Sequence, residues 1–356
     1  MRRYYIDNIR WGTIILVVLY HVIYMFNGII PDGVIGPFHE NQYQDALQYV
    51  LYPWFMVLLF LIAGMCSRYY LENHTIKEFV KSRTEKLLIP STLGLFVWGW
   101  AQGYISMSIS DAFQKLPDTM PKPVLFFIMV LSGTGVLWFI QLLWLFSMIL
   151  TLVRRFEKGT LFSLGGKANC IACLFLVVPV YLSGLVLNAP VIVVYRFGIY
   201  GLTFFLGYFV FAHDEVIEKI SRFRIPLLLA AIIACICYLL LHYGDNFSVA
   251  PTVNSIPAVL FLWFACLAIL GCMYAWGNKN TPLTTFFTKK SFGLYVFHYL
   301  PLSATAYALH KYTRVPALPS YLLVGIAAFT GGLLLYEVIS RIPIVRWFIL
   351  GMKKKK

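Results

Sequence analysis

The sequence predicts an all-α protein, a polytopic transmembrane helical bundle of about ten spans with both termini cytoplasmic. Of its 356 residues, 60% are hydrophobic and only 12% are charged, whereas about a quarter of an ordinary soluble domain is charged. Apolar runs of near 20 residues recur along the chain, and that length crosses a hydrocarbon core of roughly 30 Å. Because no loop is long enough to bury a core of its own, we predict one integral membrane domain over residues 1–356, with a basic cytoplasmic tail at 353–356.

The spans are predicted from the apolar runs between polar loops, with boundaries accurate to a few residues. They cover about 9–30, 46–66, 87–109, 136–153, 168–188, 195–213, 225–242, 256–277, 289–310 and 319–342. The first run follows Arg2 and Arg3 but is too long for a signal peptide, and no small-x-small cleavage site follows it. The segment 124–134 is apolar but short, with Gly133 and Gly135 at its end. It is either a re-entrant or interfacial piece or part of one long tilted helix.

The orientation follows from the Lys and Arg residues of the loops. With the N-terminus inside, 24 of the 29 basic residues lie in cytoplasmic segments, and the outer segments hold only Lys115, Lys122, Arg196, Lys311 and Arg314. This asymmetry, together with attraction to anionic lipid, explains the net charge of +14 without nucleic-acid binding.

The seven cysteines lie within or at the ends of the spans, where free thiols behave as small hydrophobic groups. Cys170 and Cys173 have the spacing of metal ligands, but no second ligand pair exists in the sequence. We therefore predict neither a disulfide framework nor a metal site.

Two histidines in apolar spans are candidate catalytic groups, because ionisable side chains at membrane depth are costly and tend to mark sites. His21 follows Arg10 by eleven residues, or roughly 16 Å of helix, and His298 follows Lys290 by eight residues, or about 12 Å. A single buried histidine is as often a neutral side chain bonded to a neighbouring helix. Two of them at similar depth on separate spans favour a site.

Three other charged features have two interpretations each. Glu337 lies four residues before Arg341, so an ion pair is favoured over a catalytic role. Arg196, at the outer end of the sixth span, either snorkels to the interface or meets an anionic acceptor. The loop after the second span combines apolar and basic residues as an amphipathic helix does, and it serves either as a topology anchor or as a phosphate site. Its residues are Phe79, Val80, Leu87 and Leu88 beside Lys77, Lys81, Arg83 and Lys86.

Five stretches resemble, in order, segments of the acyltransferase-3 family of integral membrane acyltransferases. They are "YYIDNIRWGTIILVVLYHV", "FVKSRTEKLLIPSTLG", "GVLWFIQLLW", "SFGLYVFHYLP" and "YEVISRIPIVRW". The chain departs from the family pattern at Lys86, where a second Arg is common, and at Phe292, where Tyr is usual. The short loops and "KLLIPSTLGLFVW" are most similar to the glucan-modifying succinyl-transferase branch.

The resemblance implies an O-acyltransferase in the cell membrane, most typically the bacterial plasma membrane. It would move an acetyl or succinyl group from cytoplasmic acyl-CoA to a hydroxyl of an extracytoplasmic carbohydrate or cell-envelope glycan. No permanently bound cofactor or metal is expected, since a thioester carries its own activation. Acyl-CoA, the glycan acceptor and membrane lipid are the expected partners.

The resemblance also suggests residue roles. His21 is expected to be the catalytic base or the acyl carrier. His298 would orient it or stabilise charge on the thioester oxygen, on a passage lined by the first and ninth spans. Arg10, Arg83, Lys86 and Arg68 are expected to hold the CoA phosphates, and Arg196, Trp138 and Glu337 to bind the acceptor.

A proton-coupled transporter is the alternative, with His21, His298 and Glu337 as a relay. Transporter folds often show internal repeats with paired broken helices, and this sequence shows none, so an enzyme is favoured.

Overall fold

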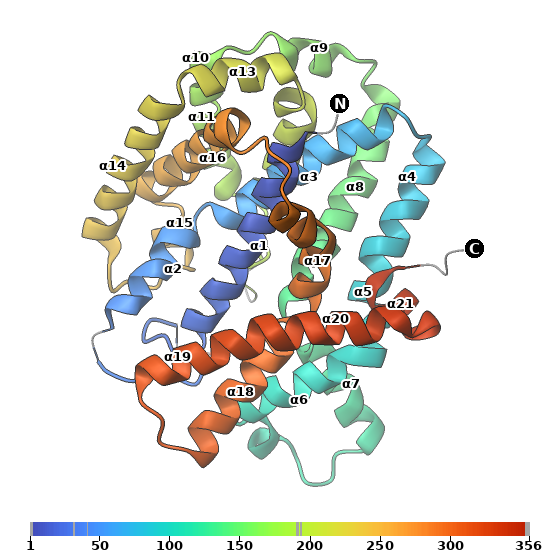
Figure 1. Ribbon diagram of the computed structural model, residues 1–356, viewed down its shortest axis with the longest axis vertical. Coiled ribbons are helices and arrows are strands. Elements are labelled where there is room, and N and C mark those ends of the chain that lie inside the picture. The colour runs from blue at the N-terminus through green and yellow to red at the C-terminus, as the bar shows by residue number, and fades with distance from the viewer. Residues whose placement is uncertain (1–2, 31–32, 41, 190–191, 193, 353–356) are drawn as a thin grey trace. The chain divides into compact units, whose positions relative to one another are not determined.

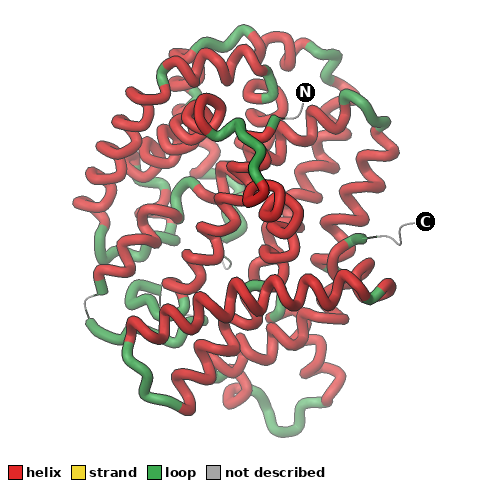
Figure 2. The backbone as a smooth tube through the Cα atoms, in the orientation of Figure 1, coloured by secondary structure: helices red, strands yellow, loops and turns green. Residues whose placement is uncertain are grey.

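The computed structural model describes residues 3–30, 33–40, 42–189, 192 and 194–352. This part of the chain is helical and contains no strand (Figure 2). Its single β-bridge joins Asn188 and Arg196. The prediction of an all-α fold is therefore confirmed.

The helices group into two compact units, neither of which is a continuous segment. Unit 1 comprises Met1–Thr13, Ala46–Val80 and Leu145–Thr288, and unit 2 comprises Ile14–Asp45, Lys81–Trp144 and Lys289–Lys356. Four helices begin in one unit and end in the other: α1(Tyr4–Tyr24), α4(Ile76–Arg83), α8(Trp138–Phe156) and α17(Pro282–Phe297). The single domain over 1–356 stays a prediction, and the tail at 353–356 lies outside the described residues.

Unit 1 is built on pairs of closely packed helices. Besides parts of the four shared helices it contains α2(Ala46–Leu51), α3(Phe55–Leu71), α9(Thr160–Gly166), α10(Cys170–Phe175), α11(Val177–Gly184), α12(Phe197–Leu206), η6(Gly207–Phe211), α13(Asp214–Arg222), α14(Arg224–His242), α15(Ala250–Val253) and α16(Ile256–Trp276). Gly64 of α3 faces the Phe204 carbonyl, and Gly207 faces that of Leu61. Small residues let membrane helices approach at backbone distance, where dispersion contacts are closest.

Unit 2 contains the second half of α1 and most of the C-terminal chain. Its other elements are η1(Tyr43–Asp45), η2(Thr84–Leu88), α5(Ile89–Ser91), η3(Leu95–Gly99), α6(Trp100–Ile109), η4(Ala112–Lys115), α7(Lys122–Ser132), η5(Gly135–Leu137), α18(Tyr299–Tyr312), α19(Ala317–Ile326), η7(Ala327–Gly331), α20(Gly332–Arg341) and α21(Pro343–Leu350). Elements α19, η7 and α20 form one long helical rod beside α18 (Figure 1). Its apolar core joins Val18, Val22 and Met25 of α1 to Leu294, Leu302 and Val324.

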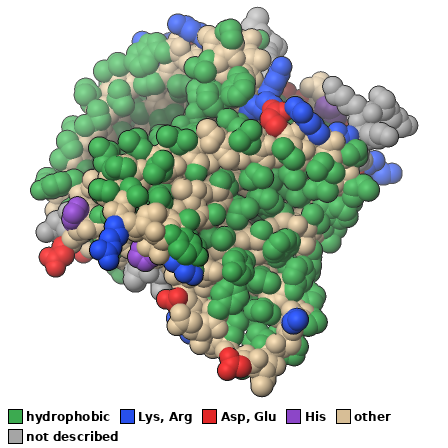
Figure 3. Space-filling model, turned by 60° about the horizontal axis from the view of Figure 1, so that its bottom comes forward, with side chains coloured by type: hydrophobic (Ala, Val, Ile, Leu, Met, Phe, Trp, Pro, Cys, Tyr) green, Lys and Arg blue, Asp and Glu red, His purple; other side chains and the backbone are tan. Residues whose placement is uncertain are grey.

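Six helical segments are long and apolar enough to cross a membrane. They are Tyr4–Tyr24, Tyr43–Leu71, Gly135–Phe156, Arg224–His242, Ile256–Trp276 and Ala317–Arg341. The pair Thr160–Gly166 and Cys170–Gly184, bent by 116°, would make a seventh. Apolar side chains cover much of the face displayed in Figure 3, as lipid contact requires. The chain is a multi-pass helical membrane protein, while the count of ten spans and the cytoplasmic termini stay predictions.

The predicted third, sixth and ninth spans are helical, but each is interrupted. The range 87–109 is divided among η2, α5, η3 and α6, the range 195–213 ends in the π-helical turn η6, and 289–310 bends between α17 and α18. The short segment at 124–134 forms the separate helix α7. Because α7 ends at Ser132 and Gly135 has a φ of 42°, it is not part of one long helix with α8.

The glycine contact in unit 1 gives a stability prediction. Gly64→Leu should lower the free energy of unfolding by about 1–3 kcal/mol, because backbone atoms cannot move aside for a new side chain as a flexible neighbour does. Gly12→Ala is the control: nothing lies within 4 Å of a Cβ there, and replacing a mid-helix glycine should add about 0.5–1 kcal/mol. Thermal unfolding of the detergent-purified chain measures both, and equal effects of the two substitutions would contradict the close packing.

Candidate active site

The two histidines singled out from the sequence meet in unit 2. His298 Nε2 lies 3.2 Å from His21 Nδ1, and their ring centroids are 5.2 Å apart. His21 projects from the last turn of α1, and His298 occupies the junction between α17 and α18. The structure thus joins two side chains that are 277 residues apart in the sequence.

Local sequence explains why the chain bends at His298. Pro301 has no N–H and its ring clashes with the carbonyl of the residue four positions earlier, so a helix kinks before it. That earlier residue is Phe297, the last residue of α17. Gly332 of α20 packs directly against the bend, where a Cβ would lie 3.2 Å from the His298 Cα. Together these residues fix where the His298 ring begins.

The hydrogen-bond partners determine the tautomers of the neutral pair. His298 Nδ1 lies 2.8 Å from the Tyr295 carbonyl and 3.1 Å from that of Leu294. Both are acceptors, so Nδ1 carries the proton and Nε2 holds a lone pair. His21 must then donate its Nδ1–H to His298 Nε2. The remaining nitrogen of His21, Nε2, therefore carries a lone pair that is directed away from this bond.

The two rings differ in their access to solvent. His298 is fully buried, whereas His21 is partly exposed. Tyr299 stands edge-on to the His21 ring at 5.1 Å, and Tyr20 at 5.3 Å. His21 is accordingly the ring that a bound molecule can reach, with His298 behind it.

A polar group near this pair was not predicted from the sequence. Gln102 of α6 is buried and its Nε2 donates to Ser303 of α18 at 3.2 Å and to Ser106 at 3.1 Å. Its Oε1 has no hydrogen-bond partner in the described chain. A buried glutamine inside the predicted third span was the sequence signal that pointed to it, since polar groups at membrane depth are costly.

Trp138 begins α8 and is half-buried. The adjoining residues pack on α17: the Tyr295 hydroxyl donates to the Val136 carbonyl, and the Phe139 and Tyr295 rings are 5.9 Å apart. Because the Tyr295 carbonyl accepts from His298, this segment supports the helix that carries the pair.

The basic residues predicted for the donor are divided between the units. Arg83 ends α4 and Lys86 lies in the π-helical turn η2, both in unit 2 with the histidines. The predicted amphipathic helix is confirmed as α4, with Phe79 fully buried and Lys81 exposed. Its first turn is a capping box, in which Thr75 N–H donates to Glu78 at 2.8 Å and Glu78 N–H to Thr75 Oγ1 at 3.3 Å. These bonds hold the pKa of the Glu78 carboxyl below its usual range.

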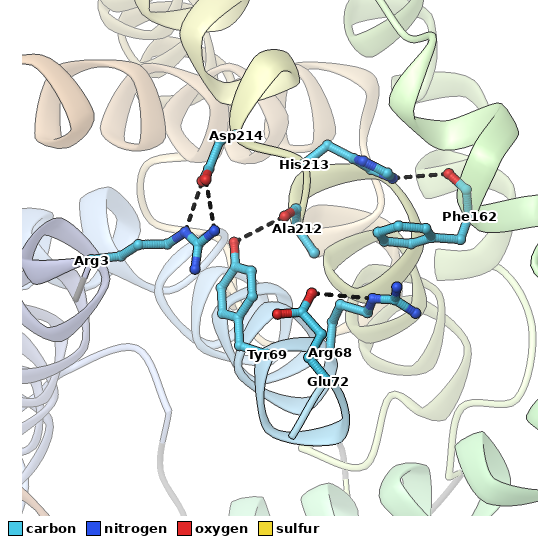
Figure 4. A network of polar contacts seen from close by, with 8 residues as sticks. All are labelled: Arg3, Arg68, Tyr69, Glu72, Phe162, Ala212, His213 and Asp214. Atoms are coloured by element: carbon cyan, nitrogen blue, oxygen red, sulfur yellow. Dashed lines mark hydrogen bonds and ion pairs between the residues drawn. The ribbon is translucent and has the colours of Figure 1, made fainter. Parts of the chain in front are cut away.

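Arg10 and Arg68 belong to unit 1 and have acidic neighbours there. Arg10 pairs with Asp7 at 2.9 Å, and Arg68 Nε lies 3.6 Å from Glu72. The Arg68 guanidinium also lies 3.6 Å from the centre of the Phe162 ring, as Figure 4 shows. These contacts occupy both side chains in structural roles on one face of their helices.

A second ion pair in Figure 4 fastens the start of the chain to α13. Arg3 donates to both carboxylate oxygens of Asp214 at 2.7 and 2.6 Å. This bidentate contact raises the pKa of the Arg3 guanidinium. Tyr69 donates to the Ala212 carbonyl at 3.1 Å beside it, so α3 and α13 meet through polar contacts at this end of unit 1.

Arg196 is almost completely buried, with 4% of its surface exposed. Its Nη2 donates to Asn254 Oδ1 at 2.6 Å. The prediction that it snorkels is therefore wrong for this structure, because the side chain turns inward to the start of α16 instead of outward to solvent.

A family model described as "Acyltransferase domain" matches residues 3–337. The chain belongs to the acyltransferase-3 family. Among curated proteins and among solved structures, no significant match was found. The matched range contains His21 and His298 and ends at Glu337, so this membrane acyltransferase carries the family pattern over nearly its whole length.

The carboxylate of Glu337 serves as an ionic link in this acyltransferase. It contacts Lys290 of α17 and lies 3.9 Å from Arg341 on its own helix. The predicted i,i+4 pair is thus present but long, and Lys290 is the nearer partner. Since Lys290 precedes His298 by eight residues, the hydrogen bonds described here do not join Glu337 to the histidines as a proton relay would require.

This link gives a prediction on coupling. Lys290→Gln and Glu337→Gln should each lower the unfolding midpoint of the acyltransferase, while the double variant should lose less than their sum. We expect a coupling of about 1 kcal/mol or less, because both side chains are partly exposed. Lys77→Gln, an exposed lysine of α4, is the control and should add independently to Glu337→Gln. Strict additivity of the Lys290 and Glu337 variants would contradict the ion pair.

Proposed function

We propose that this acyltransferase moves an acetyl or succinyl group from cytoplasmic acyl-CoA to a hydroxyl of an extracytoplasmic carbohydrate or cell-envelope glycan in a bacterial plasma membrane. The observation that carries the proposal is the hydrogen bond between His21 and His298 at the membrane-embedded end of α1. A sugar hydroxyl is a weak nucleophile at neutral pH, so its transfer reaction requires a positioned base.

The lone pair on His21 Nε2 supplies that base. As the hydroxyl oxygen attacks the thioester carbonyl carbon, Nε2 accepts the hydroxyl proton. The tetrahedral intermediate then expels the sulfur of CoA by breaking the C–S bond. The imidazolium returns its proton to that sulfur, so the products are the ester and free CoA.

His298 is a positioning residue in this scheme. Its Nδ1–H is held by two backbone carbonyls, so its Nε2 lone pair faces the His21 Nδ1–H. This bond selects the tautomer of His21 that leaves Nε2 free, and it stabilises the imidazolium that forms during transfer. A carboxylate performs the same task for the histidine of a serine-protease triad.

Arg83 and Lys86 are our proposed donor-binding residues, because they share unit 2 with the histidine pair. Arg and Lys bind phosphate through charge-assisted hydrogen bonds. Arg10 and Arg68 already face Asp7 and Glu72, and we assign them a smaller part in holding the donor.

The first functional prediction is for His21. Loss of a general base costs about 10²–10⁴-fold in rate, so His21→Ala should reduce release of CoA from acetyl-CoA by that factor. Binding of a non-transferable acetyl-CoA analogue should be kept. His242→Ala removes a histidine that faces Asp245 on α14 and should keep full activity. Turnover of His21→Ala within tenfold of the parent chain would contradict the assignment.

Two further measurements refine the roles of the pair. Incubation with acetyl-CoA alone, followed by mass analysis of the intact chain, distinguishes transfer through an acyl-histidine from direct transfer, since only the former adds an acetyl group to the protein. His298→Gln keeps an acceptor for the His21 Nδ1–H, whereas His298→Leu does not. At equal thermal stability, the Gln variant should retain more kcat than the Leu variant, with KM for the donor unchanged.

The second functional prediction is for the donor site. Arg83→Ala should weaken acyl-CoA binding about tenfold, the usual scale of a charge-assisted bond. Lys86→Ala should weaken it less, because Lys86 is exposed and its charge is screened. Affinity should fall with salt, and less steeply in the Arg83 variant. Lys77→Ala, a neighbouring exposed lysine, is the control. Equal affinities for all three variants would reduce the basic helix to a topology anchor.

A further inference from the structure

Arg196 in unit 1 is a buried positive charge without a negative partner. Its guanidinium faces the neutral amide of Asn254, and its Nε has no hydrogen-bond partner. No carboxylate lies within ion-pair distance of it among the described residues. The other basic residues just described, Arg3, Arg68 and Lys290, all have acidic partners. Arg196 differs from them in this respect although it is the most deeply buried.

The energetic cost of this arrangement points to a missing anion. Taking an ion out of water costs several kcal/mol after relaxation, and only a well-placed opposite charge with further hydrogen bonds offsets that cost. Charged residues within membrane proteins are accordingly paired or mark a binding site.

A cavity of about 300 Å³ opens directly on Arg196. Asn254 and Ser248 also line it, as do Asn188, Val249 and Val253. The amide nitrogen of Asn254 is a second donor beside the guanidinium. Gly184 of α11 leaves room for this arrangement, because a Cβ there would lie 3.1 Å from Asn254 Oδ1.

An apolar groove of about 600 Å³ adjoins this cavity, and Asn188 and Ala189 line both. One wall is a single face of α12, with Gly198, Gly201, Leu202 and Phe205 at helical spacing. Leu145, Phe146 and Ile149 of α8 form the opposite wall. The groove is hollow because the two glycines contribute no side chain at the positions nearest to Arg196.

We infer that these adjoining cavities bind a lipid with a phosphate headgroup, the phosphate on Arg196 and Asn254 and the hydrocarbon chain in the groove between α8 and α12. The planar guanidinium offers paired donors that match phosphate oxygens. The apolar groove beside it suits a chain and not a second polar group. A lipid occupant satisfies the charge of Arg196 and fills the groove at once, which free phosphate does not. The inference concerns unit 1 and does not depend on the proposed acyl transfer.

The test measures binding by the full chain in detergent, read as the shift of its thermal unfolding midpoint with ligand concentration. Three probes separate the sources of affinity: dioctanoyl phosphatidic acid, dioctanoylglycerol with the same chains but no phosphate, and inorganic phosphate with no chain. Phosphatidic acid should raise the midpoint most. Equal shifts from phosphatidic acid and dioctanoylglycerol, or from phosphatidic acid and inorganic phosphate, would overturn the lipid-phosphate site.

Variants divide the headgroup from the chain. Arg196→Gln should weaken phosphatidic acid binding at least about tenfold and leave dioctanoylglycerol binding unchanged. Leu202→Trp fills the groove and should weaken both lipids, while keeping any binding of inorganic phosphate. Leu240→Trp, on the exposed surface of α14, is the matched control and should bind all three probes as the parent chain does.

The unpaired charge makes a second, opposite-signed expectation that protects the test against misfolding. In lipid-free detergent, Arg196→Gln should unfold at the same temperature as the parent chain or higher, because it removes a buried charge that lacks a partner. With saturating phosphatidic acid, the parent chain should be the more stable. A variant that is less stable than the parent by the same amount with and without lipid would show that Arg196 is satisfied within the chain, and would overturn the inference.

Discussion

The hydrogen bond between His21 and His298 is the constraint to which the surrounding helices of unit 2 are fitted. In the apolar interior of a membrane protein, a polar side chain must find its partners within the protein. His298 meets that requirement with two carbonyls of its own helix and with His21. The Pro301 kink and the absence of a side chain at Gly332 place the ring where all three bonds form. The catalytic arrangement therefore results from satisfying one buried imidazole.

The same requirement distinguishes the cations of the chain. Arg3 is neutralised by Asp214 in a bidentate pair, and Lys290 by Glu337, and each pair joins two helices. Such residues have their partners and are explained by the fold. Arg196 has a hydrogen bond but no neutralising group, and it faces a cavity. The difference between a structural and a ligand-seeking cation is thus visible in the charge balance of its immediate surroundings, although all of them are single basic residues in the sequence.

The helical fold and the candidate histidines were predictable because each rests on a local property. Runs of apolar residues define helices, and an imidazole within such a run is conspicuous at any point of the chain. That His21 and His298 make contact was not predictable, since equal depth on two helices does not fix which faces meet. Nor did the sequence predict that Lys290 is the nearer partner of Glu337, because the i,i+4 spacing favours Arg341 whereas tertiary packing brings α17 close. Gln102 was overlooked because a single amide in a long apolar segment has many ordinary explanations.

The rod formed by α19, η7 and α20 shows how an irregular turn serves the site. Its buried positions Ser320, Val324, Ala328 and Gly332 recur every four residues, as do its exposed positions from Leu318 to Val338. An α-helix has 3.6 residues per turn, so a stripe of period four rotates by about 40° at each step. The π-helical turn at Ala327–Gly331 is wound more loosely and absorbs part of that rotation. Without it, the face of α20 that carries Gly332 would turn away from the bend at His298. The close approach of α20 to the histidine therefore depends on a backbone irregularity five residues long, placed immediately before the glycine that makes the contact.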